Sequence, residues 1–194
     1  TITRTRKNGR GWRRAKPALS VRRASPHTKS QARDEARAAV RGAAGKRASG
    51  TSVAANPNEA RRLSGMAARN GAKLVALPEY FPIMGMQDTD KVKVREEEGK
   101  GPIQQFLADI AKKHRIWLVG GSVPLVSSAP NRVRNSCLVY DDKGKQVARY
   151  DKIHLFGFEM GKEHYSEQRT IEPGNEVKVV DTPFGRIGLS ICYD

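Results

Sequence analysis

From residue 50 to the end of the chain, segments with helical spacing of apolar residues alternate with short apolar runs typical of strands. The patterns predict helices over 56–70 and 102–114, and strands near 73–77, 116–119, 136–140, 146–150, 177–180 and 186–192. Interleaved helices and strands of this kind indicate an α/β fold with layered sheets. With 194 residues, the chain has room for one ordinary hydrophobic core.

The first 49 residues follow a different pattern, with almost no apolar periodicity. They hold 15 Lys and Arg against 2 acidic residues, whereas residues 50–194 hold 21 against 18. The formal net charge of +16 therefore belongs mainly to this one segment. Because such a segment cannot bury enough apolar surface to offset its chain entropy, we predict that residues 1–49 are disordered and lie outside a domain that spans residues 50–194.

Three interpretations of residues 1–49 remain open. One is a solvated or mistranslated segment, produced by a wrong start or a shifted reading frame. The second is a basic arm that contacts nucleic acid, because Arg-rich arms bind phosphates without sequence preference. The third is a targeting peptide, since the segment is rich in Arg and Ser and poor in acidic residues.

The two cysteines, Cys137 and Cys192, bear on the cellular compartment. The basic start of the chain is followed by no apolar segment of the kind that directs export. No uninterrupted apolar stretch approaches the roughly 18 residues that span a bilayer. We therefore expect a cytoplasmic protein without a membrane partner. Both thiols would be reduced, with Cys137 packed in the core and Cys192 reactive.

Three short segments each carry one reactive side chain at or just beyond an apolar run. Glu79 lies in the segment LPEYF, Lys152 in YDKIHLF and Cys192 in GLSICYD. A thiol becomes a good nucleophile beside a base or a positive charge. A carboxylate can act as that base, and an ammonium group can stabilise the oxyanion that forms. The three residue types together therefore suit acyl transfer.

Each of these residues also has a structural explanation. Cys192 alone would be read as a buried core thiol, Glu79 as an exposed loop residue, and Lys152 as one half of an ion pair. Against this, Pro78 ends the strand ladder before Glu79, so the carboxylate is expected at a strand terminus. Cys192 follows an apolar run and is expected where a strand leaves the sheet.

In this order, the three motifs resemble those of the nitrilase superfamily of carbon–nitrogen hydrolases. The resemblance covers residues 50–194 and the first two-thirds of the family's domain. It implies that Glu79 is the general base, Lys152 the catalytic lysine and Cys192 the nucleophile. It also implies a nitrilase-like α-β-β-α layered sandwich.

The resemblance further implies supporting residues. The family has a second glutamate ahead of a Pro-Gly pair, and Glu167 occupies this position before Pro173-Gly174. The backbone N–H of Tyr193 would help to hold the oxyanion. His154 is expected to pack beside the site.

The implied activity is hydrolysis of an amide to a carboxylate and ammonia through a cysteine thioester. The run YDKIHLFGF most resembles the bacterial branch that acts on ω-amides and deaminated glutathione. The implied partners are a small-molecule amide substrate and, in the complete domain, a second copy of the chain. Neither a cofactor nor a metal is implied, and the four histidines lack the spacing of metal ligands.

The chain departs from the family pattern at both ends. Members begin with a short apolar strand, and residues 41–49 do not resemble one. The family also continues past the position of Asp194, so the sandwich is expected to be incomplete, lacking its first strand and its C-terminal third. We expect these 194 residues alone to be poorly soluble and inactive. The alternative function is an inactive amidase-like body that binds nucleic acid through residues 1–49.

Overall fold

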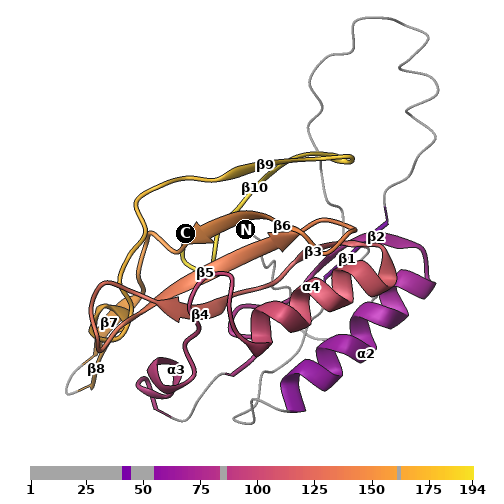
Figure 1. The fold of residues 1–194 in the computed structure, drawn as a ribbon. Coiled ribbons are helices and arrows are strands. Elements are labelled where there is room, and N and C mark those ends of the chain that lie inside the picture. The colour runs from indigo at the N-terminus through magenta and orange to yellow at the C-terminus, as the bar shows by residue number, and fades with distance from the viewer. Residues whose placement is uncertain (1–40, 45–54, 84–86, 161–162) are drawn as a thin grey trace, which may run out of the picture.

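The computed structural model describes residues 41–44, 55–83, 87–160 and 163–194 (Figure 1). The helices are α2 (Ala55–Arg69), α3 (Asp90–Lys93), α4 (Pro102–His114) and the 3-10 turn η1 (Glu167–Arg169). The strands are β1 (Arg41–Ala44), β2 (Ala72–Ala76), β3 (Trp117–Val119), β4 (Val123–Val126), β5 (Val133–Tyr140), β6 (Gln146–Asp151), β7 (Gly157–Met160), β8 (Glu163–Ser166), β9 (Val179–Thr182) and β10 (Gly185–Gly188). The predicted disorder of residues 1–49 lies outside the described residues, except at 41–44.

One six-stranded sheet forms the centre of the molecule, in the order β1-β2-β3-β5-β4, with β6 also pairing with β5. The pairs β1–β2 and β2–β3 are parallel, which is possible because a helix follows each of β1 and β2 before the next strand. The pairs β3–β5, β4–β5 and β5–β6 are antiparallel. The sheet is therefore mixed, with β5 at its antiparallel centre.

The two faces of this sheet are covered differently, as Figure 1 shows: α2 and α4 pack on one face, and the β9–β10 hairpin lies over the other. Alternate residues of β5 point to opposite faces. Leu138 belongs to the core under the helices, whereas Cys137 and Val139 belong to the core under the hairpin. The described residues thus form three layers, α-β-β.

The prediction that residues 41–49 contain no strand is wrong. Residues Arg41–Ala44 form β1, which pairs with β2 in parallel from Arg41↔Ala72 to Ala44↔Ala76. Strand pairing uses backbone N–H and C=O groups, which every residue other than proline supplies. A short edge strand of small residues has no apolar run for a sequence pattern to detect, so the first strand was missed.

Most of the other predicted elements are confirmed. The patterns located α2, α4, β2, β3 and the β5–β6 hairpin to within a few residues. The strand predicted over 186–192 is wrong at its end, because β10 stops at Gly188 and pairs only with β9. The patterns did not indicate β4, α3 or the β7–β8 hairpin. Across the described parts of the chain, no helix is long and apolar enough to cross a membrane.

Candidate active site

The segment after β2 carries Glu79 and is fixed against the turn that follows β3. Leu77 donates its N–H to Val119 O (2.9 Å), and Tyr80 donates its N–H to Ser122 Oγ (2.9 Å). A Cβ at Gly121, whose φ is +61°, would lie only 2.0 Å from Pro78 O. A larger residue at this position would therefore push away the backbone beside Glu79. Two adjacent loops thus set the direction of the Glu79 carboxylate.

Lys152 lies immediately after β6, and its side chain is completely buried. Its N–H bonds to Asn135 O (2.9 Å), which extends the β5–β6 ladder by one residue. Its Nζ lies 3.3 Å from Glu79 Oε1 and 2.9 Å from Glu167 Oε2. The structure therefore brings the two glutamates that the motifs identified onto one ammonium group.

Glu167 is also fixed from the other side. Its side chain is 8% exposed, and its Oε2 accepts the N–H of Phe156 (2.8 Å). The backbone N–H of Glu167 in turn donates to Phe156 O (3.0 Å). Phe156 follows Lys152 by four residues. The two hydrogen bonds between Phe156 and Glu167 therefore close a loop of the chain around the lysine.

Asn135 was missed by the sequence analysis. It is fully buried in β5, and its Nδ2 donates to Glu79 Oε1 (2.9 Å). Its backbone carbonyl is the acceptor for Lys152, so one residue contacts both members of the ion pair. The sequence did contain a sign of this role, because Asn135 is a polar amide within an apolar strand. A buried polar group of this kind needs a specific hydrogen-bond partner. We refer to Glu79, Asn135, Lys152 and Glu167 as the Lys152 cluster.

Cys192 lies in a turn four residues beyond β10 and has a φ of +52°. The expectation that it ends a strand is wrong, but its thiol is exposed and lies near enough to Glu79 for that carboxylate to raise its pKa. A non-glycine residue with positive φ carries backbone strain, which proteins retain mainly at functional positions. The turn thus brings the thiol to the Lys152 cluster without a strand.

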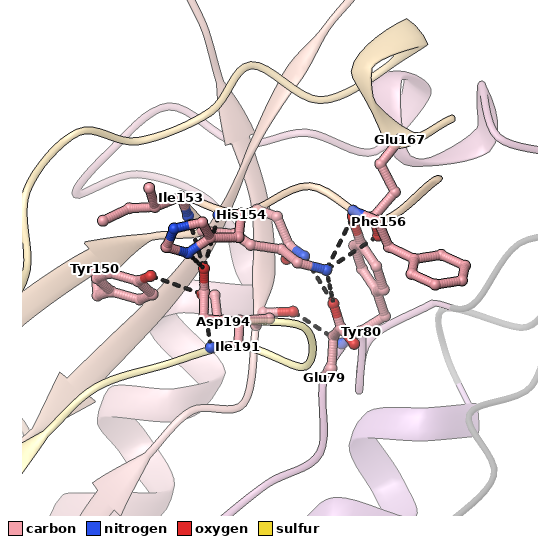
Figure 2. A network of polar contacts seen from close by, with 12 residues as sticks. Glu79, Tyr80, Tyr150, Ile153, His154, Phe156, Glu167, Ile191 and Asp194 are labelled. Carbon is pink, nitrogen blue, oxygen red and sulfur yellow. Dashed lines mark hydrogen bonds and ion pairs between the residues drawn. The ribbon is translucent and has the colours of Figure 1, made fainter. Parts of the chain in front are cut away.

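Asp194 holds this turn and was also missed. Its Oδ2 accepts the N–H of Ile191 (3.0 Å) and the hydroxyl of Tyr150 (2.6 Å). Its Oδ1 accepts the N–H groups of Ile153 (3.2 Å) and His154 (2.8 Å), as Figure 2 shows. Burial disfavours the ionised form, but these hydrogen bonds outweigh it and lower the pKa of Asp194.

The position of His154 differs from the expectation. His154 is not a packed residue, because its side chain is 66% exposed and contacts Asp194 (Nδ1 to Oδ1, 3.1 Å). Its ring projects outward because the strand ends at Asp151, before the alternation reaches it.

The pKa of the amine and the pKa of the thiol are both raised, which favours the charged form of the amine and the neutral form of the thiol. Burial lowers the pKa of Lys152, but the hydrogen bond that it donates to Glu167 and the negative charges of Glu79 and Glu167 outweigh burial, so its pKa is raised. For Cys192, burial and the Glu79 carboxylate raise the pKa, and the positive charge of Lys152 opposes them only in part. The resting site therefore pairs an ammonium with a protonated thiol that needs a base.

Cys137 behaves as the sequence analysis predicted. It is buried in the core under the β9–β10 hairpin, and burial raises the pKa of its thiol to about 12. A cavity of about 740 Å³ lies next to β6, but it is lined by residues such as Val147, Lys178 and Val179 and does not reach the Lys152 cluster. The Lys152 cluster and the Cys192 turn are therefore the candidate site.

Comparison with known proteins agrees with this geometry. The model of the carbon–nitrogen hydrolase family matches residues 37–194. The chain belongs to the carbon–nitrogen hydrolase family. The match includes β1 and begins before residue 50, where the composition of the chain changes.

Individual relatives place the chain in the nitrilase superfamily. It is 39% identical to a deaminated glutathione amidase from Yersinia enterocolitica, over 64% of this chain and 44% of that protein. It is 38% identical to an omega-amidase from Homo sapiens, over 66% of this chain and 45% of that protein. Nit3 of Saccharomyces cerevisiae, a member of branch 10 of the nitrilase superfamily, has a TM-score of 0.63 at 29% identity, over 75% of this chain and 52% of that one.

These matches confirm the α/β nitrilase-like fold. They also show that the chain spans about half the length of the relatives it matches. The second helical layer of the expected sandwich does not occur within the described ranges, 41–44, 55–83, 87–160 and 163–194.

Proposed function

We propose that this chain supplies the catalytic residues of an amidase that converts a carboxamide to a carboxylate and ammonia through a cysteine thioester. One observation carries the proposal: Lys152 Nζ contacts Glu79 and Glu167, and the charges of Glu79 and Lys152 both act on the pKa of the Cys192 thiol. A base, a buried cation and a thiol thus lie within one connected group. This is the arrangement that acyl transfer to a thiol requires.

Attack begins with a proton transfer. Glu79 takes the proton of the Cys192 thiol, and the sulfur forms a bond to the amide carbon while the carbonyl π bond opens to an oxyanion. The ammonium of Lys152 and the N–H of Tyr193 stabilise this oxyanion. In support, the Tyr193 N–H has no acceptor within the part of the chain that the structure describes.

Collapse of the intermediate breaks the carbon–nitrogen bond. Protonated Glu79 gives its proton to the departing nitrogen, which leaves as ammonia. The carboxylate of Glu79 then removes a proton from water, which attacks the thioester carbon and breaks the carbon–sulfur bond. Protonated Glu79 returns its proton to the departing thiolate, and the acid product loses its proton to solvent as the carboxylate. Lys152 remains an ammonium throughout, because the two carboxylates raise its pKa, and Glu167 holds it in place without exchanging protons.

Because the chain spans only part of its relatives, the test uses a completed domain. This is the 194 residues followed by the corresponding C-terminal part of the Yersinia relative. Ammonia release from α-ketoglutaramate and simple carboxamides is measured for the parent and for Cys192→Ala, with Cys137→Ala as the matched control. We expect Cys192→Ala to lose turnover and Cys137→Ala to keep it. In the parent, mass spectrometry should detect a thioester adduct on Cys192. Unchanged turnover in Cys192→Ala would refute the mechanism.

The 194 residues alone are proposed to be inactive. Catalysis requires reacting groups held within about 0.5 Å of productive geometry, by packed supporting elements. In this chain the Cys192 turn is supported from one side by Asp194 and the β9–β10 hairpin. Comparable ammonia release per mole of soluble protein from the chain and from the completed domain would contradict this proposal.

A further inference from the structure

Phe156 is an aromatic residue beside the candidate site to which the amidase mechanism assigns no role. Its ring centroid lies 5.7 Å from that of Tyr193, and the two ring planes meet at 66°, which is the edge-to-face geometry that aromatic pairs favour. Tyr193 itself is 63% exposed. Among the rings that the structure describes, only Phe156 contacts the ring of Tyr193. The contact therefore joins Phe156 to the residue that follows the nucleophile.

The backbone of Phe156 is fixed to the Lys152 cluster. Its N–H donates to Glu167 Oε2 (2.8 Å), and its carbonyl accepts the N–H of Glu167 (3.0 Å). The same carboxylate oxygen lies 2.9 Å from Lys152 Nζ. Phe156 is thus attached through its backbone to the partner of the ammonium group and through its ring to the Cys192 turn.

Tyr193 lies in the middle of this turn, where the backbone has few bonds. The N–H of Asp194 donates to Ile191 O (3.2 Å) and closes the turn, and the Asp194 carboxylate holds one side of it. The peptide between Cys192 and Tyr193 carries the N–H proposed to bind the oxyanion. Within the described ranges, this N–H has no acceptor that would fix its direction. On this side of the turn, the ring of Phe156 is the contact that restrains Tyr193.

We infer that Phe156 is a positioning residue for oxyanion stabilisation: its ring holds Tyr193 so that the Tyr193 N–H and the Lys152 ammonium point to the same oxygen. This inference rests on the proposed function, because it requires an oxyanion between these two donors. A donor stabilises the oxyanion only from hydrogen-bonding distance. A misplacement of about 1 Å can lower a rate by about a hundredfold. In this role Phe156 contacts neither the substrate nor the reacting atoms.

A purely structural role for Phe156 predicts a different result. Its ring also lies 6.1 Å from the ring of Phe158 and 6.3 Å from that of Tyr165, so it would then serve only to pack the β7–β8 hairpin. Loss of packing would displace the turn and slow every reaction of the Cys192 thiol. Loss of oxyanion alignment would slow only the reactions in which a carbonyl carbon becomes tetrahedral.

The test uses the completed domain and two reagents that react with Cys192. Butanal adds to the thiol: a carbon–sulfur bond forms, the carbonyl π bond opens, and its oxygen takes the position of the oxyanion. Methyl methanethiosulfonate transfers a methylthio group to the same sulfur and releases methanesulfinate. Because this second reagent has no carbonyl group, its reaction does not depend on the oxyanion donors.

Phe156→Leu removes the ring and keeps both backbone bonds to Glu167. We expect the inhibition constant of butanal to rise about tenfold and kcat for butanamide to fall by a similar factor. KM for butanamide and the rate of methylthiolation should stay within about twofold of the parent. Phe156→Tyr should restore the parent values. Phe158→Leu is the matched control, because it removes a neighbouring ring that packs on Phe156, and it should leave all four quantities within about twofold.

Two outcomes of Phe156→Leu would overturn the inference. One is a butanal affinity equal to that of the parent. The other is an equal loss with both reagents, which would show that the ring only packs the turn. Thermal unfolding establishes that each variant is folded.

Tyr193→Leu keeps the inference testable if Phe156→Leu does not fold, because it removes the same contact from an exposed side chain and keeps the backbone N–H. It should weaken butanal binding by the same factor, and the double variant should bind butanal no more weakly than either single variant. Parent-like binding in Tyr193→Leu, or additive losses in the double variant, would overturn the inference. Failure of the proposed function is separate, since it is seen as turnover or butanal binding that persists in Cys192→Ala.

Discussion

The Lys152 cluster and the Cys192 turn lie side by side but are held in place by different means. The cluster is attached to β5 and β6, and its lysine extends the ladder between these strands through Asn135 O. The turn over residues 191–194 contains no strand, and the carboxylate of Asp194 supplies most of its bonds. Lys152 and Asn135 are thus positioned by the sheet, whereas the Cys192 thiol is positioned mainly by one side chain. This difference predicts that damage to the cluster costs stability and activity together, and damage to the turn costs mainly activity.

The largest effect is expected from Lys152→Met. Removing the ammonium leaves the buried carboxylate of Glu167 and the half-buried carboxylate of Glu79 without a counter-charge. Breaking a buried ion pair in this way costs about 3–5 kcal/mol of unfolding free energy. Urea denaturation measures the loss, and turnover in the completed domain should fall by at least about 10³-fold. The double variant Lys152→Met with Glu167→Gln should recover part of the stability and none of the activity; if both return, the lysine is only structural.

Asp194→Ala should separate the two regions. It removes the acceptor for Ile191, Tyr150, Ile153 and His154, so the Cys192 turn loses its attachment. We expect turnover to fall about a hundredfold, as for other misplaced reacting groups. Unfolding free energy should change less than in Lys152→Met, because the six-stranded sheet is untouched. A stability loss equal to that of Lys152→Met would contradict the comparison.

The pH dependence of the turn follows from the same bonds. The folded pKa of Asp194 is lowered, so its stabilising bonds are present above the unfolded pKa and are lost as pH falls through the folded value. Hydrogen exchange at the Ile191 amide should therefore increase in acid before exchange at β5 amides does. Asp194→Ala should remove this difference. Simultaneous exposure of both amides would show that the turn and the sheet open as one unit.

The effect of the charges of the Lys152 cluster can be measured through the reactivity of the Cys192 thiol. The Glu79 carboxylate raises the pKa of Cys192, and Lys152 opposes this. Glu79→Gln should therefore shift the pH midpoint of Cys192 alkylation downward, while Lys152→Met should shift it upward. The measurement needs no turnover, and Cys137 does not interfere because it is buried. Shifts in the same direction in both variants would show that the thiol does not sense the cluster.

The residues proposed to carry the chemistry could be identified from the sequence because each lies in a distinctive motif. Glu79, Lys152, Glu167 and Cys192 were identified in this way, and the structure brings them together. Residues that position them were not, since Asn135 and Asp194 act through hydrogen bonds between segments far apart in the chain. No local pattern records such partners.

The elements of the fold divide in the same way, into those that a local pattern predicts and those that depend on contacts with distant segments. Helix α4 was located by its apolar periodicity, but β1 was missed, because a parallel edge strand is specified by its neighbour's backbone. The end of β10 was misplaced for a related reason. The apolar side chains of Leu189 and Ile191 pack into the core under the hairpin without strand pairing, so apolarity alone overextended the strand.

The smallest effect is expected from a substitution of Asn135, whose side chain links Glu79 to β5. Asn135→Ser removes the Nδ2 donor to Glu79 Oε1 and keeps the backbone carbonyl that binds Lys152. Glu79 Oε1 would still accept from Lys152 Nζ, so the carboxylate loses one of two fixed donors and stays near its place. Loss of one such bond corresponds to about 1 kcal/mol, so turnover should fall by about five- to tenfold with little change in KM. Ser136→Ala is the matched control, since Ser136 bonds to Asp151 and not to the cluster. An equal fall in turnover in Ser136→Ala would mean that Asn135 supports the strand and does not act on Glu79.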